Sequence, residues 1–309
     1  MRGLIGSLSR RGLRREAAAA GRPERALDPA PFGPAGPWVA HFRMNLAAPR
    51  AIRWDDGYRL TAAERRAIRR SMAKFQLGES SDGRFLLHHA ELHAARSGDL
   101  AFAEAVRLFV REEQRHAAEL ARFMEGQGLP LMRRHWSDSI FRRVRKLGGL
   151  DLALSVLLTA ELVALVYYQA LARATGSLAL RSICAEILRD ERTHVVFQAG
   201  TLGRVRLSRG PAAVRFRIRV QRLFLLLAML FVWVDHWRVF RAGRCGWRRY
   251  WHACWGAFAS IEALLSPRRM ARPAPSPAVL VTAQTEPLQP AVQHDRPRHR
   301  ERAGDGEDR

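Results

Sequence analysis

The chain has 309 residues, with 52 Lys or Arg against 29 Asp or Glu, so its formal net charge is +23. This length and a hydrophobic fraction of 48% are typical of a globular core with appendages. Three cysteines form no Cys-x-x-Cys pair. Their spacing argues against a zinc ribbon, a rubredoxin-type iron centre and a disulfide framework.

Both ends of the chain differ in composition from the middle. Residues 1–37 are rich in Arg, Ala, Pro and Gly, and residues 266–309 are rich in Pro, Arg, Gln and His. We expect both segments to be disordered, because they contain too little periodic apolar sequence to offset the entropy of ordering. Arg10 and Arg11 interrupt the N-terminal apolar residues before a secretory signal can form. The longest apolar run, Leu223–Val234, is short for a bilayer span, so we expect a cytoplasmic protein.

Helical periodicity predicts four helices within a domain over residues 38–205. The first spans about 60–97 and ends at Gly98-Asp99, with Asp99 as the N-cap of the second, about 100–125. A connection over 129–148, with a short helix expected at 138–146, leads to the third helix, about 150–174. Ser177 caps the fourth, which reaches about residue 203. Two hairpins joined by one long connection are typical of a four-helix bundle with a crossover.

A basic extension over residues 206–265 follows, with two further helices expected at about 211–241 and 246–265. Residues 215–220 alternate with period two and also fit a strand, but their neighbours favour a helix. Trp247, Trp251 and Trp255 form an aromatic stripe that we expect in the core. The basic surface is compatible with nucleic acid or an anionic membrane, yet a solvated helix face is the simpler interpretation. We expect the extension to pack on the bundle.

The second and fourth helices each carry one Glu-x-x-His: Glu113-Gln-Arg-His116 and Glu191-Arg-Thr-His194. Helix positions i and i+3 project from one face about one turn apart, so both side chains can reach one metal ion. A single such tetrapeptide is weak evidence. Two of them, each on the second helix of a hairpin, predict a metal site.

The first helix of each hairpin supplies a further carboxylate. Glu161 lies in an apolar run, where a carboxylate must be paired, protonated or bound to a cation. Glu161 and Glu191 each stand 15 residues from Gly176, so the two lie level across the hairpin. Glu79 and Glu91 compete for the equivalent place near Glu113, and neither is level with it on a continuous helix. We prefer Glu79, because its neighbours give it an inward-looking face.

The two hairpins also resemble each other around these motifs. Phe109-Val-Arg-Glu-Glu-Gln-Arg-His aligns with Ile187-Leu-Arg-Asp-Glu-Arg-Thr-His, which indicates an internal duplication. Glu112 and Asp190 therefore occupy equivalent places, each just before a Glu-x-x-His glutamate. Each can accept the ring N–H of the other hairpin's histidine and so set its tautomer. A solvated surface acid is the alternative.

Glu79, Glu113-x-x-His116, Glu161 and Glu191-x-x-His194 resemble the ligand set of the ferritin-like di-iron carboxylate superfamily, which includes ferritins, rubrerythrins, ribonucleotide reductase small subunits and di-iron oxygenases. The resemblance covers about residues 60–205 and implies an all-α, ferritin-like four-helix bundle, here with two additional C-terminal helices. It implies two iron ions, with manganese possible, bridged by Glu113 and Glu191. Glu79 and Glu161 are then terminal ligands. The absence of Cys-x-x-Cys pairs departs from a typical rubrerythrin.

Four carboxylates neutralise two divalent cations, and mixed nitrogen and oxygen ligands suit iron or manganese. We therefore expect an oxidase or oxygenase that acts on a small organic substrate with O2 or peroxide and takes electrons from an external donor. Tyr168 lies on the same helix face as Glu161 and is either a redox partner or a core residue. Iron handling or peroxide detoxification is the first alternative, and a non-catalytic membrane- or nucleic-acid-associated protein is the second. A homodimer is one possible assembly.

Overall fold

The computed structural model describes residues 34–135, 143 and 147–266, and within them every regular element is a helix. The short helix expected at 138–146 lies almost entirely outside the described residues, as do most of residues 1–37 and 266–309. The elements in chain order are α2 (Gly36–Ala47), α3 (Ala62–Glu79), α4 (Arg84–Ser97), α5 (Ala101–Gly126), α7 (Leu150–Arg173), α8 (Leu178–Val205), α9 (Pro211–Ala242), α10 (Trp247–Ile261) and the 3-10 turn η1 (Glu262–Leu265).

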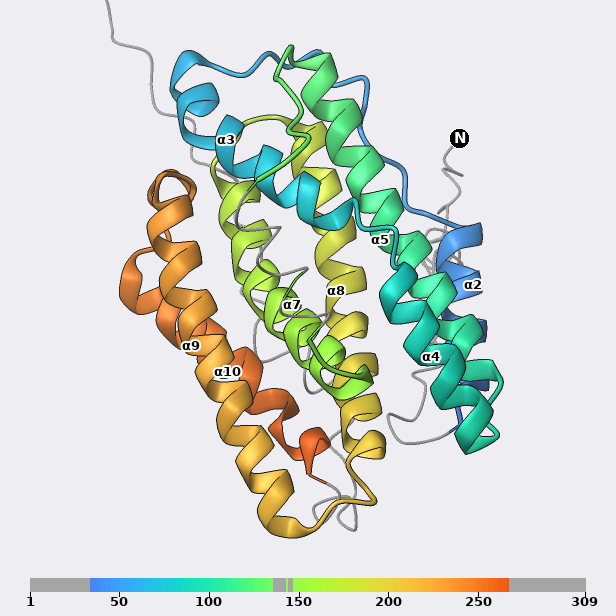
Figure 1. Cartoon of the computed structure of the whole chain (residues 1–309). Helices are drawn as coiled ribbons and strands as arrows, with labels where there is room; N and C mark the ends of the chain where they lie inside the picture. The colour runs from blue at the N-terminus through green and yellow to red at the C-terminus, as the bar shows by residue number, and fades with distance from the viewer. Residues whose placement is uncertain (1–33, 136–142, 144–146, 267–309) are drawn as a thin grey trace, which may run out of the picture.

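The antiparallel pair α7 and α8 forms the centre of the molecule. Figure 1 shows α9 and α10 on one side of this pair and α4, α5 and α2 on the other, while α3 crosses the upper part of the pair and contacts both α5 and α9. Two helices, α7 and α9, are long and apolar enough to cross a membrane by length and composition, but 83% of the apolar window of α7 is buried inside the protein. That degree of burial is typical of the core helix of a bundle.

The segment from Leu60 to Ser97 is two helices, so the expectation of one continuous helix was wrong. The first begins at a capping box, in which the Thr61 side chain accepts from the Glu64 amide and Glu64 bonds back to Thr61. The chain leaves the helical path at residues 80–83 and restarts at Gly83, whose φ is +64°. A Cβ at Gly83 would lie 2.5 Å from a methyl group of Val110 on α5, so this break needs glycine both for its conformation and for space.

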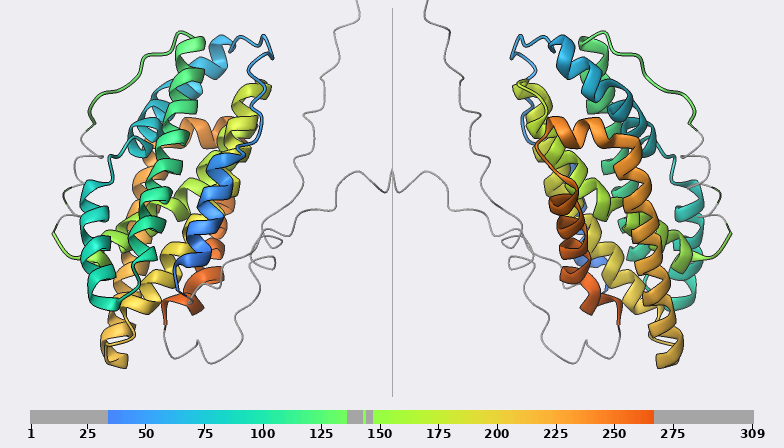
Figure 2. Two further views of the ribbon diagram at one scale, coloured as in Figure 1. Left: turned by 90° about the vertical axis from the view of Figure 1, so that its right-hand side faces the viewer. Right: turned by 90° about the vertical axis from the view of Figure 1, so that its left-hand side faces the viewer.

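The helix α2 was not predicted, because residues 36–37 were assigned to the disordered N-terminal segment and the following residues to no element. Trp38 and Phe42 are buried, and the Phe42 ring lies 5.3 Å from that of Phe197 on α8. Asp99 was expected to cap α5, but its carboxylate accepts from the Ala35 amide at 3.0 Å instead and so fixes the start of α2. α2 packs along α5, as the left view of Figure 2 shows.

The turn between α7 and α8 follows the prediction. The Ser177 hydroxyl accepts from the Leu180 amide at 3.2 Å, which confirms the N-cap of α8. Asp56 strengthens this turn by accepting from the Ser177 hydroxyl at 2.7 Å and from the Ala179 amide at 2.8 Å. The pair of facing helices that carries Glu161 and Glu191 is therefore held in one register.

The extension is helical, including residues 215–220, and one face of α9 packs on α7 and α3. Buried polar side chains define this contact. His236 Nδ1 lies 2.6 Å from the Ser71 hydroxyl of α3, and Gln221 donates to the Thr159 hydroxyl of α7 at 2.8 Å. Asp235 forms an ion pair with Lys74 of α3. The last helix is shorter than expected, since α10 ends at Ile261 and tightens into η1.

Candidate metal centre

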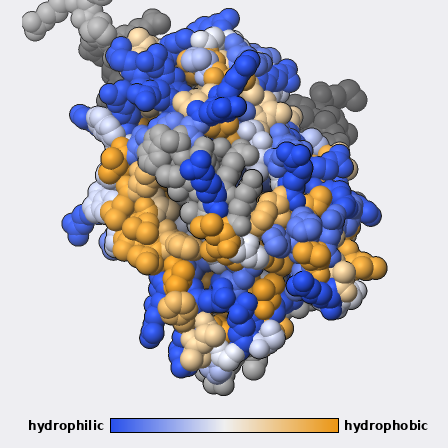
Figure 3. Space-filling view, in the orientation of Figure 1, coloured by the Kyte–Doolittle hydropathy of each residue, from blue (hydrophilic) through white to orange (hydrophobic). Residues whose placement is uncertain are grey.

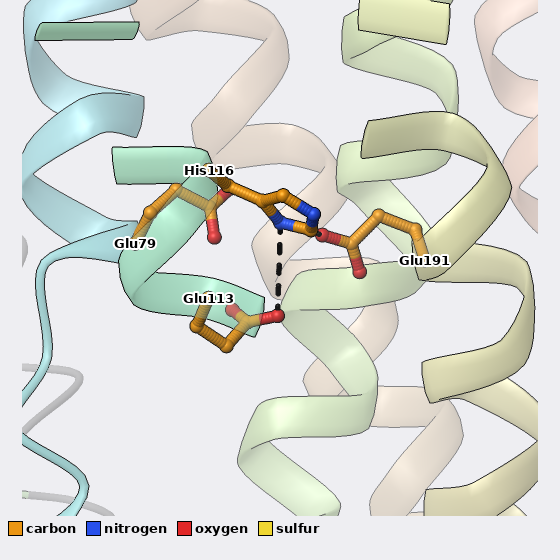
Figure 4. Close-up of side chains that lie close together, drawn as sticks. All are labelled: Glu79, Glu113, His116 and Glu191. Carbon is orange, nitrogen blue, oxygen red and sulfur yellow. Dashed lines mark ion pairs between the residues drawn. The ribbon is translucent and has the colours of Figure 1, made fainter. Parts of the chain in front are cut away.

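Six of the predicted site residues converge in the interior between α3, α5, α7 and α8. Their ligand atoms form two groups, in each of which the atoms lie within 4.8 Å of one another. Figure 4 shows members of the first group pointing toward one another from α3, α5 and α8. The first group is Glu79, Glu113, His116 and Glu191, and the second is Glu113, Glu161, Glu191 and His194.

Glu79 belongs to this cluster and Glu91 does not. Glu79 is the last residue of α3 and is buried, with a relative exposure of 8%. The helix ends directly after Glu79. Glu79 therefore does not have the offset along the helix axis from Glu113 that one continuous helix would impose. The Glu91 side chain is 51% exposed on α4 and pairs with Arg107 at 3.5 Å.

The two histidines are held by the acids that the internal duplication pairs with them. His116 Nε2 lies 3.1 Å from Asp190 Oδ2, and His194 Nε2 lies 2.8 Å from Glu112 Oε2. All four side chains are fully buried. Each acid is thus an acceptor for an Nε2 proton, which leaves Nδ1 of the ring as the lone-pair nitrogen.

Both Nδ1 atoms face the cluster. Neither has a hydrogen-bond partner among the described residues, and the same is true of both carboxylate oxygens of Glu191 and one of Glu113. His194 Nδ1 lies 2.9 Å from Glu113 Oε1 without the alignment of a hydrogen bond. Buried polar atoms are nearly always partnered, so several unpartnered lone pairs that converge on one point fit a bound cation.

The pKa values of the predicted glutamates reflect burial without a counterion. Burial, with the neighbouring charge of Glu113 acting in the same direction, raises the pKa of Glu79 to about 8. Burial also raises the pKa of Glu191, with Glu161 and Glu113 acting in the same direction. Like charges crowded in a dry site favour the protonated forms, and a divalent cation would reverse that preference.

The histidine pKa values reflect two opposing effects. Burial is the largest single effect and lowers the pKa of both rings. For His116 the hydrogen bond to Asp190 and the charges of Glu113 and Glu79 together outweigh burial, and for His194 the contacts with Glu112, Glu113 and Glu191 do so, and both pKa values are therefore raised. The cluster without a cation therefore holds protons on its nitrogen and oxygen atoms. Metal binding must displace these protons, which makes metal affinity depend on pH.

Sequence reasoning missed the arginines behind Asp190. Arg115, inside the first Glu-x-x-His motif, pairs with Asp190 and also bonds Glu186 at 3.2 Å. Arg189 donates to Asp190 Oδ1 at 3.0 Å and to Glu186 at 2.6 Å. This network lowers the pKa of Asp190, through His116 first and Arg189 next, against the effect of burial. The only indication of this network in the sequence is the arginine that directly precedes each of the two acids, Glu112 and Asp190.

Two further neighbours touch the terminal glutamates. The Tyr168 hydroxyl donates to Glu79 Oε1 at 2.6 Å, and the Gln198 amide donates to Glu161 Oε1 at 3.0 Å. Tyr168 is fully buried, and burial followed by the Glu79 charge raises its pKa. Gln198 follows His194 by four residues on α8, so helical spacing alone could have indicated that it lies near the site.

A cavity of about 190 Å³ connects this cluster with the space between α3, α7 and α9. Glu79, Glu113 and Glu161 lie on its wall, and most of its other lining is apolar, including Val156, Ala160, Ala164, Ala228 and Phe231. The carboxylates are therefore reachable by a small molecule even though they are shielded from bulk water.

The residues present fit a metal ion: two imidazole nitrogens and four carboxylates, all buried except the partly buried Glu113, close together in two groups and with several unpartnered atoms. The metal's identity is not determined by this donor set. No family model, curated protein or solved structure matches this chain. The chain is thus, on its own geometry, an all-helical protein with a buried carboxylate and histidine cluster that could hold metal ions.

Proposed function

We propose that this chain is a ferritin-like di-iron carboxylate protein that oxidises a small organic substrate with O2 or peroxide. The observation that carries the proposal is the overlap of the two ligand groups, which share Glu113 and Glu191 and differ in the remaining residues. Two sites that share two carboxylates describe a two-metal centre with carboxylate bridges. Manganese is the alternative metal, since it favours the same nitrogen and oxygen donors.

In this assignment Glu113 and Glu191 would be common to both metal sites. Glu79 and His116 would help to hold one ion and Glu161 and His194 the other, with Nδ1 as the histidine donor. The four carboxylates carry a formal charge of −4, which balances two divalent cations. Two adjacent reducible metal ions supply the capacity to activate oxygen or peroxide.

The protein's own side chains set the conditions for this chemistry. Asp190 and Glu112 keep the Nε2 protons in place, so that Nδ1 remains free to bind metal. Tyr168 holds Glu79 by a hydrogen bond and offers an O–H next to the centre. The mostly apolar lining of the cavity limits the access of bulk water to the carboxylates, which would reduce side reactions with solvent.

The cavity indicates the class of substrate. An engineered protein cavity of about 150 Å³ accommodates benzene, so 190 Å³ suits a single ring or a short chain. Its lining of Phe, Val, Leu and Ala side chains favours a largely apolar substrate. The substrate would meet Glu79, Glu113 and Glu161 at the inner end of the cavity.

The test is an anaerobic titration of the metal-free, full-length chain with ferrous iron, followed by admission of O2. We expect two iron ions per chain, and a change in the absorption spectrum on oxidation that needs both ions. One ion per chain, or none, would contradict the two-metal assignment. Accumulation of many ferric ions per chain would support iron storage instead of substrate oxidation.

A further inference from the structure

The outer face of α9 is apolar, and the other helices do not cover it. Its members are large side chains that are between 44% and 72% exposed: Phe216, Leu223, Leu227, Leu230, Val234 and Trp237. From Leu223 onward they recur at intervals of four and three residues, so they form one stripe on the helix. Figure 3 shows apolar surface on the side of the molecule where α9 lies. We refer to these six residues as the α9 stripe.

The opposite face of α9 is already occupied, which makes the stripe a separate feature. Leu225 and Val239 are fully buried against the protein, and only 39% of the apolar window of α9 is buried. Asp235 and His236, which would be poorly placed in lipid, are turned inward onto Lys74 and Ser71 of α3. The stripe therefore presents no carboxylate to its surroundings.

Arginines bound the stripe at both ends. Exposed Arg219 and Arg222 lie between Phe216 and Leu223, just before the continuous part of the stripe, and exposed Arg238 and Arg241 follow Trp237 at its C-terminal end. The apolar part between them, from Leu223 to Trp237, is about 21 Å long. Trp237 on α9 and Trp247 on α10 are partly exposed, as is typical of side chains at a lipid headgroup boundary.

The charges around the α9 stripe favour one class of partner. Within residues 206–266 the two acids are committed: Asp235 to Lys74, and Glu262 to Arg222 at 2.7 Å. A second copy of the chain, paired on this stripe in either direction, would bring arginine ends against arginine ends. An anionic lipid surface would instead supply the missing negative charge together with an apolar interior.

We propose that the α9 stripe docks this protein onto an anionic phospholipid membrane, with α9 lying in the plane of the headgroups. A spanning orientation is disfavoured, because α3 packs beside α9 and exposes Arg66, Arg69 and Arg70. The cavity is lined in part by Ala228, Phe231 and Val232 of the same helix. If the proposed function holds, an apolar substrate dissolved in the membrane would have a short path to the carboxylates, but docking itself does not depend on the metal site.

The experiment is co-sedimentation of the full-length protein with vesicles of phosphatidylcholine alone or with about one third phosphatidylglycerol. We expect binding to the anionic vesicles, weaker binding to the neutral ones, and loss of the difference at high salt. Leu227→Glu should weaken binding about tenfold or more. Its control, Leu178→Glu, makes the same change at an exposed site on α8 and should leave binding unchanged.

A charge-reversal pair tests the arginine rim. Arg238→Glu should weaken binding to anionic vesicles at least fivefold, whereas Arg96→Glu, at an exposed site on α4, should have little effect. Circular dichroism and iron content should be unchanged in all four variants, which separates this proposal from the proposed function.

Three outcomes would overturn docking on a membrane. Equal binding by Leu227→Glu and the unmodified chain would show that the stripe is not the contact. A dimer in light scattering that Leu227→Glu dissociates, without vesicle binding, would identify a second copy as the occupant. Binding to duplex DNA that Leu227→Glu leaves intact, without vesicle binding, would identify nucleic acid.

Discussion

Asp190→Asn removes a buried negative charge that several donors share. His116 Nε2 and Arg115 contact one carboxylate oxygen, and Arg189 Nε contacts the other at 3.0 Å. Asn has the same shape, but one of its two groups is a donor. In either orientation of the amide, its NH2 group points at a side chain that was itself donating to Asp190, so two donors face each other.

The expected damage has two parts. Breaking a buried ion pair by removing one partner costs about 3 kcal/mol, so the metal-free Asp190→Asn protein should be less stable by roughly that amount. His116 also loses its charged acceptor, and where the NH2 group takes the place of Oδ2 it loses the acceptor altogether, which allows the ring proton to move to Nδ1, the atom that faces the cluster. Metal affinity should therefore fall about 10- to 100-fold.

Glu112→Gln is the matched control for the ion-pair part. Glu112 accepts from His194 Nε2 at 2.8 Å, and within the described residues no arginine is seen to bond it. The amide oxygen of Gln can still accept this hydrogen bond. We expect a loss of about 1 kcal/mol at most and a decrease in metal affinity of about tenfold.

Urea unfolding of the metal-free proteins measures the first part, and anaerobic ferrous titration measures the second. If the two variants lose equal stability, the Arg115 and Arg189 network does not stabilise the fold as described. If Asp190→Asn binds iron as tightly as the unmodified chain, Asp190 does not control the His116 tautomer.

Three further predictions concern the cluster and the helix break beside it. His116→Ala and His194→Ala should each reduce bound iron below two per chain while far-UV helicity is retained, because packing holds a bundle of this size; unfolding of either variant would mean a structural histidine. Glu79 has a pKa raised to about 8 against about 4.5 when unfolded, so the metal-free protein should lose stability as the pH rises from about 4.5 to 8; urea midpoints that are constant or rise over this window would contradict the shift. Gly83→Ala should destabilise the protein by more than 2 kcal/mol, whereas Gly98→Ala, also at positive φ but in open space, should cost only about 1 kcal/mol; equal losses would show that contact with α5 is unimportant.

The amino-acid sequence by itself determined those features that depend on local geometry. Glu113 with His116, and Glu191 with His194, share a helix face because their spacing of three residues is nearly one helical turn. The tight turn at Gly176 and Ser177 sets Glu161 level with Glu191, since equal distances along two facing helices from one turn bring residues together. The reciprocal hydrogen bonds of the two histidines followed from the internal repeat for the same reason.

The position of Glu79 was decided by the tertiary structure. The periodicity of residues 60–97 is compatible with one helix, and on one helix neither Glu79 nor Glu91 is level with Glu113. The break lies in Ser80-Ser81-Asp82-Gly83, a local turn signal that the expectation of one continuous helix did not weigh. The close approach of Gly83 to Val110 of α5, a residue nearly thirty positions away, is the part that no local pattern predicts. Glu79 became the site residue because α3 ends there.

Long-range contacts also decided which polar residues surround the cluster and which surfaces remain open. Arg115 looks like a solvated arginine in an arginine-rich sequence until the packing of α5 on α8 brings it onto Asp190, where Arg189 of the same helix also pairs with the carboxylate. α2 is stabilised by the packing of Trp38 and Phe42 against Phe197 of α8, and its own periodicity does not predict it. The apolar pattern of α9 is compatible with a buried helix or a membrane surface. Only the packing of one of its faces on α3 and α7 revealed that the other face, the α9 stripe, is left exposed, because sequence periodicity records apolar positions but not the number of surfaces that cover them.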